Sequence, residues 1–107
     1  MRRADVFLFG TLAGRLAEEA EGGFTFQYDH DYIARPDAIP VSVRLPLRAE
    51  PYRSRFLFPF FDGLIPEGWL LNVATQSWKL DPNDRMGLLL ACCKDCIGAA
   101  SIREVAP

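Results

Sequence analysis

The sequence lacks an excess of positive charge. Its 12 lysines and arginines are outnumbered by 14 aspartates and glutamates, which gives a formal net charge of -2 and an isoelectric point near 5.3. Proteins that capture nucleic acid usually present a basic field to the phosphate backbone. Direct binding of nucleic acid is therefore not expected, and other proteins are the more suitable partners.

Long hydrophobic runs are also missing. No apolar stretch reaches the roughly 18 residues that a membrane-spanning helix needs. The first residues, Met1 to Asp5, lack the apolar core of a signal peptide. We therefore expect no membrane partner and a cytoplasmic location.

Cysteine and histidine are scarce. The three cysteines, Cys92, Cys93 and Cys96, are an odd number in one short stretch, which cannot build the disulfide framework of a secreted protein. Their C-x-x-C spacing occurs in zinc and redox sites, but a closed zinc site usually needs four ligands, and the single histidine, His30, is distant in the sequence. We expect structural thiols at a helix end and no metal or cofactor, with adventitious metal binding and redox work as the alternatives.

Catalytic motifs are absent as well. The sequence has no phosphate-binding glycine loop, no dinucleotide-binding fingerprint, no nucleophile elbow and no zinc-protease helix motif. Asp29, His30 and Asp31 resemble a general-base or ligand cluster, but neighbouring side chains in a strand or turn point apart. We expect a surface turn there, and we do not expect this chain to be an enzyme.

The residues that are present suit one folded domain spanning 1–107. Half are hydrophobic and 24% are charged, a balance that can bury a core. Val6 to Phe9 is rich in aromatic and β-branched residues and predicts a strand that ends at a glycine turn. Phe24 to Tyr28 alternates aromatic and polar residues, which predicts a half-buried strand.

The segment between these two strands can be interpreted in two ways. Leu12 to Ala20 contains alanine, leucine and glutamate, which favour a helix. The segment is short, however, and leads into Gly22 and Gly23. A hairpin around this glycine pair would instead pair the segment with Phe24 to Tyr28.

Prolines dominate the middle of the chain. Five of them lie between Asp29 and Pro59, too many for a helix of any length. Short strands and loops are expected there. Val41 to Leu45 alternates apolar and polar residues between Pro40 and Pro46, which predicts a strand with one solvated face.

Two helices and a closing strand are predicted in the last third. The first helix begins at Pro66 and Glu67, which suit a first turn, and runs to about Ser77. The second is predicted to open with Asp81 as N-cap, Pro82 at the first helical position and Asp84 as the acidic capping-box residue, and to run through about Ala91. Its buried stripe is Met86, Leu89, Leu90 and Cys93.

The predicted fold class is α+β. About five short strands form a small antiparallel sheet or partial barrel, followed by the two helices and a closing strand. That strand is expected at Ile97 to Ile102, with Arg103 to Pro107 as a tail.

Trp69 is the residue that helical periodicity singles out. On the first predicted helix, the core-face residues, which include Trp78, gather within about 120° around the helix axis. Trp69 lies about 140° from the centre of that face, on the side of Asn72, Gln76 and, at the margin, Val73. A large apolar side chain flanked by polar ones is a candidate interface hot spot. The alternative is that the proline-rich segment covers the ring.

Several stretches, occurring in the same order along the chain, resemble the N-terminal domain of HipA-type kinases. Phe60 to Gly68 reads F-F-D-G-L-I-P-E-G, similar to the family signature F-F-D-G-L-L-P-E-G. The family usually has glycine where Cys93 stands, so the turn before the last strand is a departure. The family's opening strand and glycine turn correspond to Val6 to Gly14, and its F-x-Y-x-x-x-Y stretch corresponds to Phe26, Tyr28 and Tyr32. Its P-x-S-x-x-L-P-L stretch is matched by Pro40, Ser42, Leu45, Pro46 and Leu47. Its closing D-C-x-G-A-x-x-I motif is matched by Asp95, Cys96, Gly98, Ala99 and Ile102.

The resemblance implies a function exerted through another chain. In full-length HipA-type proteins this domain precedes a kinase body, whose nucleotide-binding loop and catalytic aspartate do not occur here. The chain is therefore expected to be similar to the HipS antitoxin of three-part HipBST toxin–antitoxin systems. Its expected partner is a HipT-like serine/threonine kinase toxin, with a HipB-like DNA-binding protein as a further candidate in a ternary complex. The expected partner-binding residues are Trp69, Asn72, Val73, Gln76 and Glu67.

Two other functions stay open on the sequence. The chain could be a non-inhibitory structural module that completes the fold of a larger HipA-type kinase complex. It could also be a small thiol or metal enzyme built on the cysteines.

Overall fold

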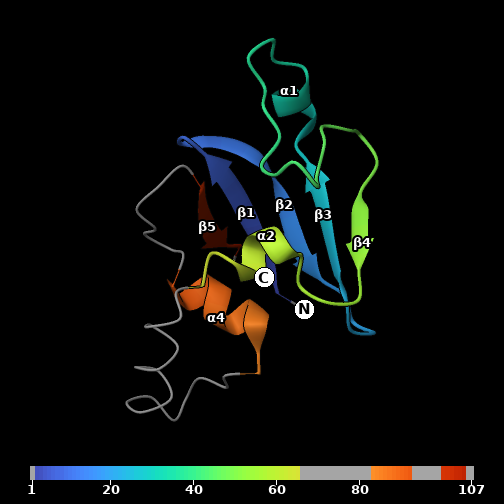
Figure 1. The fold of residues 1–107 in the computed structure, drawn as a ribbon, viewed down its shortest axis with the longest axis vertical. Helices are drawn as coiled ribbons and strands as arrows, with labels where there is room; N and C mark the ends of the chain where they lie inside the picture. The colour runs from blue at the N-terminus through green and yellow to red at the C-terminus, as the bar shows by residue number, and fades with distance from the viewer. Residues whose placement is uncertain (1, 66–82, 93–99, 106–107) are drawn as a thin grey trace.

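The computed structural model describes residues 2–65, 83–92 and 100–105. An open antiparallel sheet has the strand order β4-β3-β2-β1-β5, and short helices accompany it (Figure 1). This confirms the predicted α+β fold class. The strands are β1 (Arg3–Leu8), β2 (Thr11–Glu18), β3 (Phe24–Tyr28), β4 (Tyr52–Ser54) and β5 (Ala100–Glu104), and the helices are α1 (His30–Ile33), α2 (Pro59–Asp62) and α4 (Arg85–Cys92).

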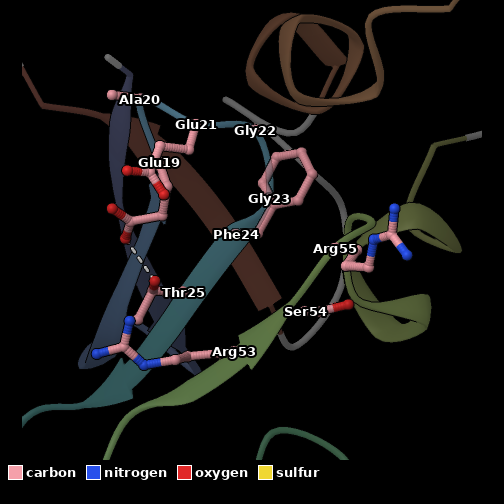
Figure 2. Close-up of a pocket in the computed structure, with 10 residues that line it drawn as sticks. All are labelled: Glu19, Ala20, Glu21, Gly22, Gly23, Phe24, Thr25, Arg53, Ser54 and Arg55. Carbon is pink, nitrogen blue, oxygen red and sulfur yellow. Dashed lines mark hydrogen bonds between the residues drawn. The ribbon is translucent and has the colours of Figure 1, made fainter.

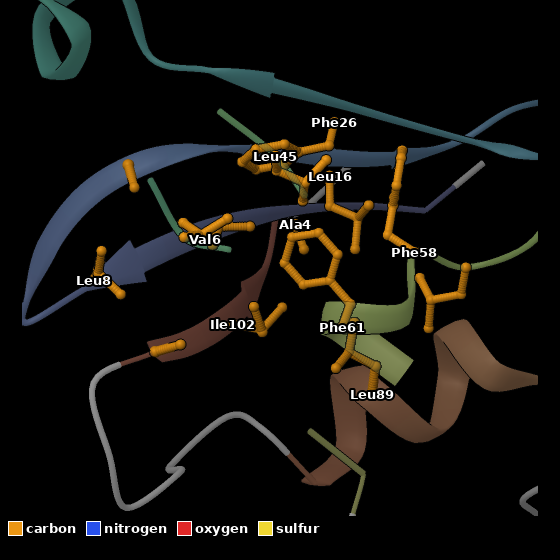
Figure 3. Close-up of a cluster of buried hydrophobic side chains, with 14 of the residues drawn as sticks. Ala4, Val6, Leu8, Leu16, Phe26, Leu45, Phe58, Phe61, Leu89 and Ile102 are labelled. Carbon is orange, nitrogen blue, oxygen red and sulfur yellow. The ribbon is translucent and has the colours of Figure 1, made fainter. Parts of the chain in front are cut away.

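The two faces of the sheet differ in burial. In β1, Ala4, Val6 and Leu8 are buried while the residues between them are not, because successive side chains of a strand point to opposite faces. The buried side, here called the inner face, packs against α2 and α4 (Figures 1 and 3). The opposite side is here called the outer face.

The core forms where α2 and α4 meet the inner face. Phe61 of α2 and Leu89 of α4 point toward the strands in Figure 3, and both are fully buried. The Phe61 ring centroid lies 5.3 Å from that of Phe26 on β3. The largest fully buried side chains are Phe26, Phe61, Leu16, Met86, Leu88, Leu89, Ile102 and Val6.

The ambiguous segment Leu12 to Ala20 forms β2, not a helix. Hydrogen-bonded pairing with β1 on one side and β3 on the other outweighs its helical propensity. Gly14 permits this close pairing: a Cβ atom there would lie 2.5 Å from the Gln27 carbonyl oxygen and 2.9 Å from the Phe26 ring. Any side chain at this position would push the two strands apart.

The strand predicted at Val41 to Leu45 was wrong. The segment is a tight turn with a single bridge between Ser42 and Leu45. Prolines on both sides cannot donate to a sheet, and Tyr28 takes up the backbone groups instead. Its hydroxyl donates to the Leu45 carbonyl oxygen and accepts a hydrogen bond from the Val41 N–H at 3.0 Å.

The proline-rich region contains one short strand, as its expected class allows, at a position that was not predicted, and one helical turn that was not expected. The strand β4 pairs with β3 through Phe24 with Ser54 and Phe26 with Tyr52. A single helical turn, α1, also forms, although we expected no helix in this region. Asp29 caps that turn, since its carboxylate accepts a hydrogen bond from the Tyr32 N–H at 3.2 Å. His30 and Asp31 are exposed at its surface.

Replacing Tyr28 by phenylalanine is expected to lower the free energy of unfolding by about 1 to 3 kcal/mol, because a buried carbonyl and a buried N–H lose their partner. Burial raises the pKa of the Tyr28 hydroxyl to about 12, so it remains a donor at neutral pH. Urea denaturation measures the change. Tyr52→Phe is the matched control: its hydroxyl donates to the Pro46 carbonyl at an exposed position, where water can replace it. An equal loss in both variants would contradict the role assigned to Tyr28.

The second predicted helix begins later than expected. It starts at Arg85, and its cap is Asp84, whose carboxylate accepts a hydrogen bond from the Gly87 N–H at 3.2 Å. Met86 and Leu89 are buried as predicted, Leu90 is partly buried, and Cys93 lies outside the described residues. Across the described residues, no helix has the length and apolar character needed to cross a membrane.

The closing strand is confirmed as β5, which pairs antiparallel with β1. It runs to Glu104, two residues beyond the predicted end, and the predicted start at 97–99 falls outside the described residues. Pairing with β1 explains the longer strand, since Ala4 lies opposite Glu104 and the Val105 N–H donates to the Arg3 carbonyl at 2.8 Å.

Candidate partner-binding site

The predicted partner-binding residues belong to a segment that the structure does not describe. Trp69, Asn72, Val73, Gln76 and Glu67 all lie within 66–82, outside the described residues. The structure does describe how the chain leaves the fold before this segment, at Ile65, and how it returns after it, at Asn83. These two places flank the predicted partner-binding segment.

The departure point is fixed by aromatic packing of the signature stretch. Pro59 opens α2 at a position where a missing N–H costs nothing. Phe61 is fully buried, and its ring contacts those of Phe58 and Phe60 at centroid distances of 6.2 and 5.1 Å. Ile65 is buried at the end of the stretch. The buried residues of the signature stretch therefore fix the position of the chain before residue 66.

The return point is fixed by an arginine that holds two carboxylates. The Arg2 guanidinium donates to both carboxylate oxygens of Asp84 at 2.8 Å, and to those of Glu18 at 3.0 and 2.8 Å. Asp84 also caps α4, so Arg2 ties this helix to β2. These charge-assisted hydrogen bonds hold the pKa of Glu18 and of Asp84 below their usual ranges.

A second ion pair joins the departure and return points directly. The Arg85 Nε donates to the Asp62 carboxylate at 2.5 Å, which links the end of α2 to the start of α4. The segment 66–82 is therefore attached at both of its ends to the same edge of the fold. Sequence reasoning identified neither pair. Asp84 was read only as an acidic capping-box residue, and nothing in the sequence pattern connects Arg2 with residues so far along the chain.

Replacing Arg2 by methionine is expected to lower stability by about 1 kcal/mol at pH 7, a modest figure because the three side chains are about one-third exposed. Carboxylates whose pKa is lowered by folding add stability above their unfolded values, near 4, and lose it as the pH falls through the folded values. The difference in melting temperature between wild type and Arg2→Met should therefore shrink from pH 7 to pH 3. A difference that stays constant with pH would contradict this.

Arg35→Met provides the matched control for that experiment. Arg35 also forms a two-bonded ion pair, with Asp37, but on an exposed loop. Exposed pairs contribute little to stability because water and salt screen them. We expect no measurable change in melting temperature at either pH.

A groove lies beside the return point. It has a volume of about 420 Å³ and combines apolar with charged walls, the mixture that protein interfaces use. Phe56 on its rim is 76% exposed. The lining residues are Glu18, Phe24, Arg55, Phe56, Leu57, Asp62, Asn83, Asp84, Arg85 and Met86. The groove is a candidate surface for a protein partner.

A second depression lies at the hairpin between β2 and β3 and beside β4 (Figure 2). Its carboxylate Glu19 is already engaged, since the Thr25 hydroxyl donates to it at 2.5 Å. Ser54 accepts a hydrogen bond from the Phe56 N–H at 3.3 Å. The Thr25 and Glu19 side chains meet at an exposed position, and we assign this depression no chemical role.

The described residues do not form a metal-binding cluster. No group of three or more histidine, cysteine, aspartate or glutamate side chains within residues 2–65, 83–92 and 100–105 could hold an ion. Cys93 and Cys96 of the C-x-x-C stretch fall outside those ranges. The Asp29 carboxylate caps α1, and one of its oxygens lies 3.7 Å from a guanidinium nitrogen of Arg15, so it is already engaged within the fold.

Comparison with known proteins decides the family. The family model described as the HipA N-terminal domain matches residues 4–103. The chain belongs to this family. A solved structure described as the N-terminal domain of HipA toxin superposes with a TM-score of 0.78 and 33% identity, covering 99% of this chain and 94% of the other. The HipA resemblance seen in the signature stretch is thus confirmed at the level of the domain.

Two relatives carry this HipA domain in proteins of very different length. An uncharacterised protein of Haemophilus influenzae is 36% identical over 104 residues, which cover 97% of this chain and 93% of that protein. The putative kinase Y4mE of Sinorhizobium fredii is 30% identical over 102 residues, which cover 95% of this chain and only 24% of that protein. The chain thus spans about a quarter of the putative kinase.

Proposed function

We propose that this chain binds a separate HipA-type serine/threonine kinase chain and inhibits it, as an antitoxin of the HipS kind. The observation that carries the proposal is the pair of relatives. The HipA N-terminal domain makes up a quarter of a putative kinase, yet nearly the whole of the Haemophilus protein. A domain that occurs in both settings is suited to act on a kinase from a separate chain.

The proposed mechanism is steric and needs no chemistry by this chain. A kinase must align its phosphate-covering loop, its metals and its substrate, so a small displacement suffices to stop phosphoryl transfer. The segment 66–82, with Trp69 as its aromatic anchor, would dock near the kinase active site. Its attachment at Ile65 and at Asp84 supports this, because a docking segment held at both ends loses less conformational entropy on binding.

The groove beside α4 would extend the same interface. Its exposed Phe56 and its arginines offer the residue types that are enriched at protein contacts. The proposed partners are therefore a HipT-like kinase at this edge and, in a larger complex, a HipB-like protein that would carry DNA binding. Direct contact of this chain with DNA is not part of the proposal.

Co-expression with the cognate kinase tests the proposal. An inhibitor restores the growth of cells that the kinase arrests, and the purified chain stops kinase autophosphorylation in vitro. The alternative, a structural module that completes a kinase complex without inhibiting it, predicts binding with no rescue and unchanged or higher kinase activity. Rescue by this chain together with loss of kinase activity would exclude the alternative, and growth arrest despite a stable complex would exclude inhibition.

A further inference from the structure

The turn that joins β1 to β2 has an unusual residue at its tip. Leu8 pairs with Thr11, so Phe9 and Gly10 form a two-residue hairpin turn. Both have positive φ, 49° and 79°, as the favoured hairpin turns require. Such turns normally use Asn-Gly, because a bulky side chain in the left-handed region is strained. Phe9 is the one non-glycine residue with positive φ in residues 2–65, 83–92 and 100–105.

The side chain gives the fold nothing in return for this strain. Phe9 is 74% exposed, so its ring adds almost no buried surface to the core. Asparagine or glycine would form the same turn with less strain and without exposing an aromatic ring. A strained backbone that also presents an apolar side chain points to a role outside the folding of the domain.

Next to this turn, β1 and β2 carry apolar side chains on the outer face. Phe7 lies directly opposite Leu12 in the hairpin and both are partly exposed. The exposed Arg103 of β5 holds its guanidinium 5.8 Å from the centre of the Phe7 ring. We call Phe7, Phe9, Leu12 and Arg103 the hairpin patch. It combines aromatic and arginine side chains, the types most enriched among interface hot spots.

The chemistry of the hairpin patch specifies its occupant. An exposed phenyl ring fits an apolar pocket, and the arginine beside it fits a carboxylate on the rim of that pocket. The turn lies at the end of the sheet far from α4 (Figure 1), so a partner that also contacts the α4 edge must be a large protein.

We propose that Phe9 is a second anchor for the kinase chain, inserting into an apolar pocket that is bordered by a carboxylate. This inference rests on the proposed function and adds to it a contact at the opposite end of the sheet. Two separated anchors would fix the orientation of the domain on the kinase. They would also require that the kinase surface span most of the sheet.

Phe9→Asn separates this role from folding. The variant should raise the melting temperature by about 4 to 8 °C, because asparagine adopts the left-handed conformation with less strain. It should also weaken binding to the cognate kinase at least tenfold in calorimetry. Phe9→Gly should weaken this binding to the same extent. A more stable protein that binds less well is the expected signature of an anchor retained for a partner.

Val43→Asn is the matched control. Val43 is 92% exposed at the tip of the turn between Ser42 and Leu45 and has no positive φ. Neither its melting temperature nor its kinase affinity should change. Unchanged kinase affinity in Phe9→Asn, or a lower melting temperature, would overturn the inference while leaving inhibition by the wild-type chain intact. Failure of the wild-type chain to bind the kinase would overturn the proposed function and the anchor together.

Discussion

Replacing Phe61 by alanine is expected to lower the free energy of unfolding by about 3 to 5 kcal/mol. The ring is fully buried and lies 5.3 Å from that of Phe26, with Phe58 and Phe60 on its other sides. Truncation would remove these contacts and leave a cavity between α2 and the inner face, since neighbouring rings can refill it only in part. For a domain of this size the total stability is about 5 to 15 kcal/mol.

Urea denaturation followed by circular dichroism measures this loss, and the melting temperature should fall by about 4 to 8 °C per kcal/mol. Phe56→Ala is the matched control. It removes the same ring from a site that is 76% exposed, where the expected change is within about 0.5 kcal/mol. A loss below about 1 kcal/mol in Phe61→Ala would mean that the signature stretch is not held by its aromatic core.

The second large effect concerns binding. Trp69→Ala is expected to weaken affinity for the cognate kinase by about 2 to 4 kcal/mol, the range for an anchoring aromatic residue. This corresponds to a rise in Kd of about 30-fold to nearly 1000-fold. The fold should persist, with an unchanged circular dichroism spectrum, because helical periodicity places this side chain away from the core face.

Trp78→Ala serves as the contrasting variant. Periodicity places this second tryptophan on the core face, so its removal should cost about 3 to 5 kcal/mol of stability if the ring is fully buried. The two tryptophans should thus separate, one affecting binding and the other folding. A Kd for Trp69→Ala within threefold of wild type, or a loss of stability in its place, would show that this ring belongs to the core.

The strands that follow a regular pattern could be predicted from the sequence, and the others could not. Phe24 to Tyr28 alternates aromatic and polar residues, and β3 has the predicted bounds. Val41 to Leu45 alternates in the same way, but the Tyr28 hydroxyl captures its backbone groups and the segment turns back on itself. Alternation reports which side chains are buried and does not report what the backbone bonds to.

Long-range partners account for most of the remaining differences. The three residues of β4 form a strand only because β3 offers an edge to pair with, and β2 is a strand because neighbours flank it on both sides. Arg2 meets Asp84 across 82 positions of sequence. Single-sequence patterns are local, so they cannot reveal contacts that exist only after the sheet has formed.

The candidate site was predicted unevenly for the same reason. The family was correctly inferred from the signature stretch, whereas the predicted partner-binding residues lie outside the described residues. The ion pairs that fasten the edge at which α2 and α4 meet were missed, as was the conformation of Phe9. A phenylalanine before a glycine in a predicted turn is a usable signal, because both of the favoured two-residue turns, types I′ and II′, require positive φ at the first position.

The pairing of β5 with β1 sets a constraint on synthesis of the protein. The first strand receives its second neighbour only when residues 100–104 have been made, so these residues must leave the ribosome before the five-stranded sheet is complete. Until then the backbone of β1 presents an open edge that other nascent chains could join. Any truncation before Ala100 would make this exposure permanent, and such a product should be recovered as aggregate or degraded.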